Sequence, residues 1–134
     1  MKKIYTAKSK IEGKGVFAEE EIKKGEDIIE YNGDKINSDE GDARADEQLN
    51  KGHLYIFKLN EEFDIDGDIK DNTAKFINHS CDPNCETVIY DEKEILIVAL
   101  KDIKKDEELT FDYQLTGDRV IQCNCQSKNC RGMI

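Results

Sequence analysis

The stretch from Phe76 to Cys85 constrains the fold more than any other part of this sequence. It places the polar run Asn-His-Ser-Cys-Asp-Pro-Asn between an apolar lead-in at Phe76-Ile77 and a second apolar segment. Asn, Asp, Ser and Pro favour turns because they bond the local backbone or fix its torsion angles. The sequence therefore predicts a fixed, irregular backbone path in mid-chain. Taken alone, His79 fits either a catalytic residue or a hydrogen-bonded structural histidine.

Most other apolar residues fall in short runs that are typical of β-strands. The runs are rich in Ile, Val, Tyr and Phe, and turn residues such as Asn32-Gly33 and Asp66-Gly67 bound them. They predict strands at Gly15–Ala18, Asp27–Tyr31, His53–Leu59, Glu62–Asp66, Thr87–Tyr90, Ile95–Leu100 and Glu108–Phe111.

Only one segment has the composition of a full helix. Gly41–Lys51 is rich in helix-forming residues, and Gly52 follows it where a C-terminal cap belongs. One further turn of helix is expected at Asn72–Phe76. The sequence therefore predicts a mainly β (α+β) fold of several small sheets with few short helices. Alternating β-α-β units are not expected.

The charge of the chain narrows the classes of partner. The 134 residues fit a single domain and carry a formal net charge of −10. An acidic surface repels DNA phosphates and anionic lipids and attracts basic partners. We therefore expect no direct nucleic-acid binding. The charge taken alone is explained better by solubility, and the alternative is a basic protein or peptide as the partner.

No apolar run approaches the ~20 residues needed to span a bilayer. The first residues, Met1–Thr6, also lack the apolar core of a secretory signal. We therefore expect no membrane association and an intracellular protein, nuclear or cytoplasmic or exported into a host cell. Thiols stay reduced inside cells, so the five cysteines suggest metal ligands more than disulfides.

Three cysteines close to the C-terminus form a candidate metal site. Cys123, Cys125 and Cys130 lie within eight residues of one another. Structural zinc takes four tetrahedral ligands, so the fourth must come from Cys81 or Cys85. The alternative is a cluster of free thiols. Because the tail is otherwise polar, it has little with which to fold unless a metal is bound.

Two further segments carry recognisable patterns. Residues 12–17 read Glu-Gly-Lys-Gly-Val-Phe, and residues 109–113 read Leu-Thr-Phe-Asp-Tyr. A lone Gly-x-Gly is weak, and the absence of a full Gly-x-Gly-x-x-Gly after a strand disfavours a dinucleotide-binding fold. Tyr113 taken alone would be an ordinary strand tyrosine.

In this order, the pieces resemble the SET domain family with its cysteine-rich post-SET tail. The resemblance runs from about Tyr5 to Arg131. It rests on Gly13–Ala18, Glu30–Gly33, Tyr55–Phe57, Phe76–Cys85, Glu107–Tyr113 and the Cys-Asn-Cys-x4-Cys tail. It implies a SET domain at residues 1–116 and a post-SET tail at 117–134, with small curved sheets and a pseudoknot near residues 78–81.

This sequence also departs from the family pattern. It has no cysteine-rich pre-SET region, and the insert that carries the helix is short. Lys75 stands where the family often has arginine, a change that we expect to be tolerated. The first two departures remove surfaces that larger relatives use to bind partners or select substrates.

The resemblance implies an S-adenosylmethionine-dependent protein lysine N-methyltransferase that acts on a basic protein, with a histone or histone-like tail as the expected substrate. Tyr113 is the expected catalytic tyrosine, Tyr31 and Tyr55 are expected to line the lysine channel, and Phe111 is expected to govern how many methyl groups are added. The implied cofactor contacts are Glu12, Lys14, Gly15, Tyr55, Asn78, His79 and Asn124. The implied structural zinc ligands are Cys81, Cys123, Cys125 and Cys130.

Two other interpretations stay open at this point. One is a catalytically silent SET-fold binding or scaffold protein, which should bind no S-adenosylmethionine. The other is a small zinc-binding interaction module built on the cysteine tail, which leaves the upstream motifs unexplained.

The resemblance also bears on the number of methyl groups. With Phe111 rather than tyrosine beside the lysine nitrogen, the enzyme is expected to reach di- or trimethyl-lysine.

Overall fold

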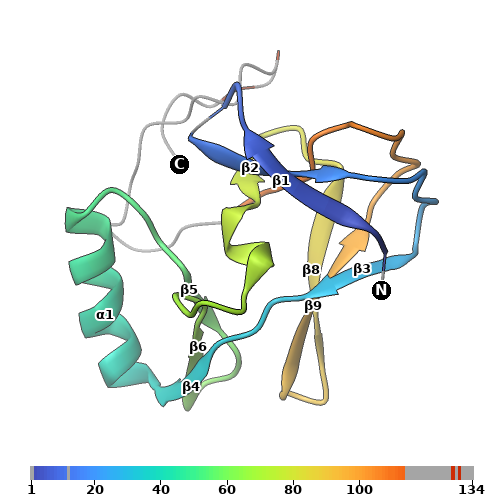
Figure 1. The fold of residues 1–134 in the computed structure, drawn as a ribbon. Coiled ribbons are helices and arrows are strands. Elements are labelled where there is room, and N and C mark those ends of the chain that lie inside the picture. The colour runs from blue at the N-terminus through green and yellow to red at the C-terminus, as the bar shows by residue number, and fades with distance from the viewer. Residues whose placement is uncertain (1, 12, 114–127, 129, 131–134) are drawn as a thin grey trace.

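The computed structural model describes residues 2–11, 13–113, 128 and 130, and most of its elements are short strands (Figure 1). The mainly β class with few helices is therefore confirmed. The elements are β1 (Ile4–Lys8), β2 (Lys14–Ala18), β3 (Asp27–Glu30), β4 (Asp34–Asn37), α1 (Ser38–Asn50), β5 (Ile56–Lys58), β6 (Phe63–Asp66), the 3-10 turn η1 (Thr73–Phe76), β7 (Asn78–His79), β8 (Cys85–Tyr90), β9 (Glu94–Ala99) and β10 (Thr110–Phe111).

Within the described residues the strands form small separate sheets. β1 and β2 make an antiparallel hairpin, β9 lies between β3 and β8, and β6 lies between β4 and β5. Each sheet buries one face in a common core, in which Val16, Ile22, Ile28, Ile77, Ile97, Ile103 and Leu109 are fully buried. In Figure 1, α1 lies beside the β4–β6–β5 sheet, far from β1 and β3.

The fourth sheet joins the two most distinctive sequence segments. β7 and β10 run parallel, with Asn78 opposite Thr110 and His79 opposite Phe111. The side chain of Asn84 fixes this arrangement, since its Oδ1 accepts from the Thr110 N–H at 2.9 Å and its Nδ2 donates to the Glu108 carbonyl at 2.8 Å. This crossing of distant segments lies where the resemblance places the pseudoknot.

Helix α1 begins at Ser38, three residues before the predicted start at Gly41. The reason is a cap that the prediction did not use: Asn37 Oδ1 accepts from the Glu40 N–H at 2.9 Å. The helix ends at Asn50, and Gly52 follows in the left-handed region with φ +88°, as predicted for the end of the helix. Gly41 is buried against β6. Glycine is required there, because a Cβ atom would overlap the Asp64 carboxylate.

The predicted strand His53–Leu59 is too long. Only Ile56–Lys58 is a strand, because the backbone N–H groups of His53 and Tyr55 bond the carbonyl and side chain of Gln48 at the end of α1. The predicted strand Glu108–Phe111 is likewise reduced to Thr110–Phe111, since Leu109 donates to the Val16 carbonyl of β2. Strands β1, β4 and β7 were not predicted; β4 has Ile36 as its one apolar residue.

Candidate active site

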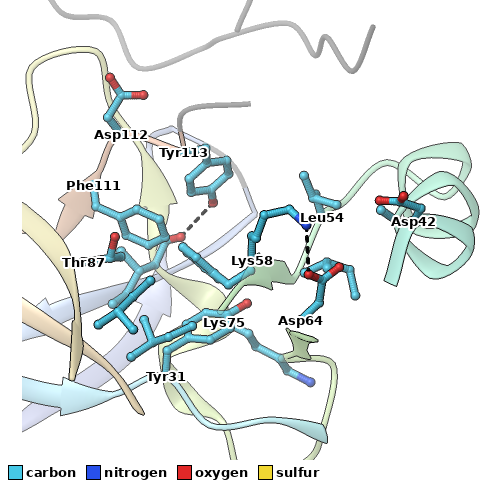
Figure 2. A pocket seen from close by; sticks show the side chains of 16 residues that line it. Tyr31, Asp42, Leu54, Lys58, Asp64, Lys75, Thr87, Phe111, Asp112 and Tyr113 are labelled. Carbon is cyan, nitrogen blue, oxygen red and sulfur yellow. Dashed lines mark hydrogen bonds and ion pairs between the residues drawn. The ribbon is translucent and has the colours of Figure 1, made fainter. Parts of the chain in front are cut away.

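A cavity of about 300 Å3 lies where the sheets meet (Figure 2). Its floor carries three of the residues singled out from the sequence: Tyr31, Phe111 and Tyr113. Helix α1 and the segment through β5 form one wall, and the β8–β9 hairpin forms the other. The wall residues include Ala45, Leu54 and Ile56 on the first side and Thr87, Ile89 and Ile95 on the second.

Aromatic rings form a continuous row along the floor of this cavity. The Tyr31 and Phe57 rings meet edge to face with centroids 4.5 Å apart. The Phe57 and Phe111 centroids are 5.6 Å apart, and those of Phe111 and Tyr113 are 5.0 Å apart. Such a row presents an apolar surface that a long, unbranched side chain can enter.

Two phenol groups at this floor have fixed positions. The Tyr113 hydroxyl donates to the Ile77 carbonyl at 2.8 Å, the bond drawn beside Tyr113 in Figure 2. The Tyr31 hydroxyl donates to the Tyr55 carbonyl at 2.9 Å. Burial raises the pKa of Tyr31 well above its ordinary value, and neighbouring Tyr113 adds to the effect. Tyr31 therefore stays an uncharged phenol at neutral pH.

A hydrogen-bond chain connects α1 to the Tyr31 phenol. Arg44 Nη1 and Gln48 Nε2 donate to the two carboxylate oxygens of Asp66 at 2.8 and 3.0 Å. Gln48 Oε1 accepts from the Tyr55 N–H at 2.8 Å, and the Tyr55 carbonyl accepts from Tyr31. Burial acts to raise the pKa of Asp66, but the bonds from Arg44, from the Asp68 backbone N–H and from Gln48 outweigh it and lower the pKa. The carboxylate is therefore ionised. Through these bonds, α1 holds Tyr31 in position at the cavity floor.

Replacing Gln48 by leucine should break this chain at its centre. The change removes the bond partner of the Tyr55 N–H and one of the two hydrogen bonds to Asp66 Oδ1. This loss should cost about 1–3 kcal/mol of unfolding free energy. Any activity that this site supports should fall several-fold as Tyr31 and Tyr55 lose their support. Urea denaturation and initial rates measure both effects. Asn50→Leu, an exposed change on the same helix, is the control. A Gln48→Leu protein as stable and active as this control would contradict the proposed role.

A second group of candidate residues lies beside η1. The Lys14 and Lys75 ammonium groups lie 4.7 and 5.2 Å from the centroid of the Phe76 ring. Lys75 also lies 5.8 Å from the Tyr55 ring centroid and lines the cavity. The two ammonium groups place positive charge beside the cavity, which suits an anionic group of a ligand.

Asn78 and Gly15 complete this second group. Asn78 Nδ2 donates to Glu108 Oε2 at 3.0 Å and to the Lys14 carbonyl at 3.2 Å. Gly15 allows the close approach of β2 to Glu108, because a Cβ atom at Gly15 would overlap that carboxylate. The predicted cofactor residues Lys14, Gly15 and Asn78 are therefore neighbours.

His79 links the cavity floor to Cys81. Its Nδ1 accepts from the Tyr113 backbone N–H at 3.0 Å, so in a neutral ring the hydrogen resides on Nε2. That Nε2 lies 3.3 Å from Cys81 Sγ. Cys81 therefore contacts a residue that bonds the backbone at the cavity floor.

The two candidates for the fourth zinc ligand differ in environment. Cys85 is 1% exposed in the core, and burial raises the pKa of its thiol to about 12. Cys81 is only partly buried. The donor set therefore fits zinc better through Cys81. Among the residues that the structure describes, no three His, Cys, Asp or Glu side chains gather at one point. Cys123 and Cys125 lie outside the described residues, and Cys130 is exposed.

The remaining predicted site residues either do not line the cavity or lie outside the residues that the structure describes. Glu12 and Asn124 are among the residues that the structure does not describe. The Tyr55 ring stacks on His53, with centroids 4.6 Å apart, and Tyr55 is not among the residues that line the cavity. Sequence reasoning missed Phe57 and Ile77. Phe57 had a usable signal, because it lies two residues after Tyr55 in a predicted strand.

Comparison with known proteins gives a consistent result. The SET domain family matches residues 13–114. The chain is 39% identical to an H3 lysine-4 specific histone-lysine N-methyltransferase of Aspergillus oryzae, covering 99% of this chain and 12% of that protein. It is 40% identical to histone-lysine N-methyltransferase trithorax of Drosophila virilis, covering 92% of this chain and 3% of that protein. This chain thus spans only a small part of these relatives.

Solved structures agree with this result. The chain resembles ctPRC2 in an autoinhibited conformation bound to S-adenosylmethionine, with a TM-score of 0.75 and 37% identity over 84% of this chain and 15% of that one. A humanized mutant of the Chaetomium thermophilum Polycomb Repressive Complex 2 gives a TM-score of 0.72 and 38% identity with the same coverage.

In the described part of the chain, no helix is both long and apolar enough to cross a membrane.

Proposed function

Because this chain belongs to the SET domain family, we propose that it transfers methyl groups from S-adenosylmethionine to a lysine side-chain nitrogen of a basic protein. The observation that carries the proposal is the aromatic cavity floor, where Tyr31, Phe111 and Tyr113 line one channel. The cationic group around Phe76 adjoins it through Lys75. Channel and cofactor groups therefore meet, as a group transfer requires.

The channel prepares the lysine as a nucleophile. A free lysine has a pKa near ~10.4, so the neutral amine is scarce at neutral pH. The aromatic row disfavours the charged ammonium by removing it from water. Tyr31 supports this effect, since its raised pKa keeps a phenolate from forming beside the amine. The channel thus favours the neutral amine that the reaction needs.

Tyr113 orients that amine. Its hydroxyl hydrogen is engaged by the Ile77 carbonyl, so the phenol oxygen can accept a hydrogen bond from the amine N–H. This contact turns the nitrogen lone pair in a set direction. Correct positioning of reacting groups can supply ~7–11 kcal/mol of a barrier in favourable systems.

The cofactor residues fit S-adenosylmethionine in their chemistry. When bound, this cofactor supplies a methyl group carried on a sulfonium centre. Lys14 and Lys75 provide positive charge for a carboxylate, and Asn78 and His79 provide polar groups beside the channel. Gly15, Tyr55, Glu12 and Asn124 remain in the proposed set on the family resemblance.

We propose one structural zinc at the C-terminal tail. This metal takes no part in the transfer step. The proposed ligands are Cys81, Cys123, Cys125 and Cys130. The tail would then be anchored beside His79 and the cavity floor, since Cys81 contacts His79. Residues 1–116 form the proposed catalytic unit and 117–134 the proposed post-SET tail.

The proposed substrate is a histone tail. Both relatives reported above are named histone-lysine N-methyltransferases, and the name of the Aspergillus oryzae protein adds the words H3 lysine-4 specific. A net charge of −10 favours a substrate rich in lysine and arginine. A histone substrate implies that the protein acts in the nucleus of a eukaryotic cell.

Incubation with methyl-labelled S-adenosylmethionine and core histones tests the proposal. Label should enter histone protein, and mass spectrometry should find it on lysine. Calorimetric titration with S-adenosylmethionine separates the silent alternative, because a scaffold without the cofactor site binds none. Label on no protein or peptide substrate would overturn the proposed function, and no cofactor binding as well would favour the silent alternative.

Replacing Phe111 by tyrosine should restrict the product to monomethyl-lysine. Phe111 is 3% exposed, its ring lies 5.0 Å from that of Tyr113, and it lines the cavity, so it borders the space around the lysine nitrogen. A phenol oxygen there can hold water in space that a methylammonium needs. Phenylalanine holds none, so the wild type should reach di- or trimethyl-lysine. Product masses over time, under excess cofactor, measure the difference. A wild type that stops at one methyl group contradicts the assignment.

A further inference from the structure

The β8–β9 hairpin carries an apolar side chain that the core does not use. Ile89 is 45% exposed and lines the cavity, whereas Ile95, its cross-strand partner, is 1% exposed. Residues two apart on a strand share a face, so Thr87 and Ile89 form one strip along the cavity wall. The strip leads from the cavity to the tip of the hairpin, which projects from the body of the molecule (Figure 1).

The tip of the hairpin is acidic. Residues 86–94 carry four carboxylates and one ammonium group, and all five side chains are exposed. Asp91 and Glu92 form the turn itself, with φ of +51° and +54°. Two consecutive residues at positive φ make the tight turn that matches the twist of a hairpin. The turn therefore holds two carboxylates at the outer end of the apolar strip.

We propose that Thr87, Ile89, Asp91 and Glu92 form a second contact surface for the substrate, which begins at the lysine channel and extends outward to the hairpin turn. It takes the extended segment that flanks the target lysine, with an apolar side chain on Ile89 and basic side chains at the turn. This inference rests on the proposed function, because the strip begins in the cavity that receives the lysine.

Two observations favour this occupant. The strip is continuous with the cavity, since Thr87 and Ile89 line it together with Phe111. The charge of the turn is complementary to a basic protein segment. Thr87 lies three residues before Tyr90, and a strand rises about 3.3 Å per residue. The turn is thus roughly 10 Å beyond Thr87, the reach of about three residues of an extended peptide.

A peptide library tests the surface without a known substrate. Each peptide has one central lysine and four randomised positions on each side. After brief methylation, mass spectrometry identifies the flanking residues enriched in the product. Wild type should enrich apolar residues close to the lysine and Lys or Arg about three positions away, on one side.

Two variants address the two parts of the surface separately. Asp91→Asn with Glu92→Gln keeps the turn but removes its charge, and should reduce the basic preference about two- to fivefold. Ile89→Ser should reduce the apolar preference about three- to tenfold. Glu19→Gln with Glu21→Gln is the charge-matched control, and Leu100→Ser is the control for an exposed apolar residue. Both controls should keep the wild-type pattern.

The outcomes distinguish the two proposals. A wild type that methylates neither the library nor core histones overturns the proposed function. A wild type that methylates without any flanking preference overturns the second surface alone. The same holds if the Asp91/Glu92 and Ile89 variants, shown to be folded by thermal melting, keep the wild-type preferences. Loss of preference in these variants and not in the controls supports the surface.

Discussion

Replacing Tyr113 by phenylalanine should lower kcat by about 10²–10³-fold, the usual cost of removing one positioned polar group from a transition state. The hydroxyl bonds the Ile77 carbonyl and faces the cavity beside Phe111, so it is placed to orient the amine. Because this contact matters most in the transition state, kcat and kcat/KM should fall together. Single-turnover and steady-state rates on a histone or a library-derived peptide measure both.

Folding and cofactor binding should survive this change. Removing one neutral hydrogen bond costs about 0.5–1.5 kcal/mol, and the ring can still pack against His79 and Phe111. Calorimetric titration should give the wild-type affinity for S-adenosylmethionine. Tyr5→Phe is the matched control, because Tyr5 lies on β1, does not line the cavity, and likewise loses one hydroxyl hydrogen bond, to Asp106. Turnover of Tyr113→Phe within about twofold of this control would exclude Tyr113 as the orienting residue.

The fold class could be predicted from local sequence because turn residues mark the ends of most strands. Runs such as Ile95–Leu100 contain consecutive apolar residues and end at charged turns, so they were predicted to within one residue of β9. β4 was missed for the opposite reason: its sequence, Asp-Lys-Ile-Asn, has the polarity of a loop. Its pairing with β6 supplies the stability that its own composition lacks.

The parts of the candidate site that escaped prediction depend on long-range contacts. Gln48 was read as an ordinary helix residue, yet it bonds both Asp66 and the Tyr55 N–H. Nothing in the local pattern of α1 indicates which of its polar residues faces β6. The motif residues, in contrast, could be grouped from the sequence. Asn78, His79 and Tyr113 were grouped by family resemblance, and the pairing of β7 with β10 places them together.

The closeness of His79 to both Tyr113 and Cys81 joins two proposals that were independent in the sequence. If Cys81 holds the tail through zinc, the metal site and the channel floor share one histidine as a neighbour. Loss of zinc would then disturb the channel from outside, although the metal takes no part in the transfer. Metal content and activity should then rise and fall together.

Purified protein should contain one zinc per chain, and Cys130→Ser should lose the metal and nearly all activity. Structural zinc needs four ligands, and a thiolate cannot be replaced by a hydroxyl without a large loss of affinity. The polar tail would lose the main energy that folds it. Elemental analysis by mass spectrometry gives the zinc content, and labelled methyl transfer gives the activity. A fully active protein without zinc would contradict the metal site.

Comparing Cys81→Ser with Cys85→Ser decides the fourth ligand. Cys81 is partly buried beside the His79 imidazole, so its serine variant should lose zinc as Cys130→Ser does. Cys85 is buried in the core with a thiol pKa of about 12, so it is poorly suited to bind as a thiolate. Its serine variant should keep one zinc per chain and lose only stability, by about 1–3 kcal/mol, because a hydroxyl replaces the sulfur. Zinc lost from Cys85→Ser and retained in Cys81→Ser would reverse the assignment. In that case the core at the start of β8 would have to open to reach the metal.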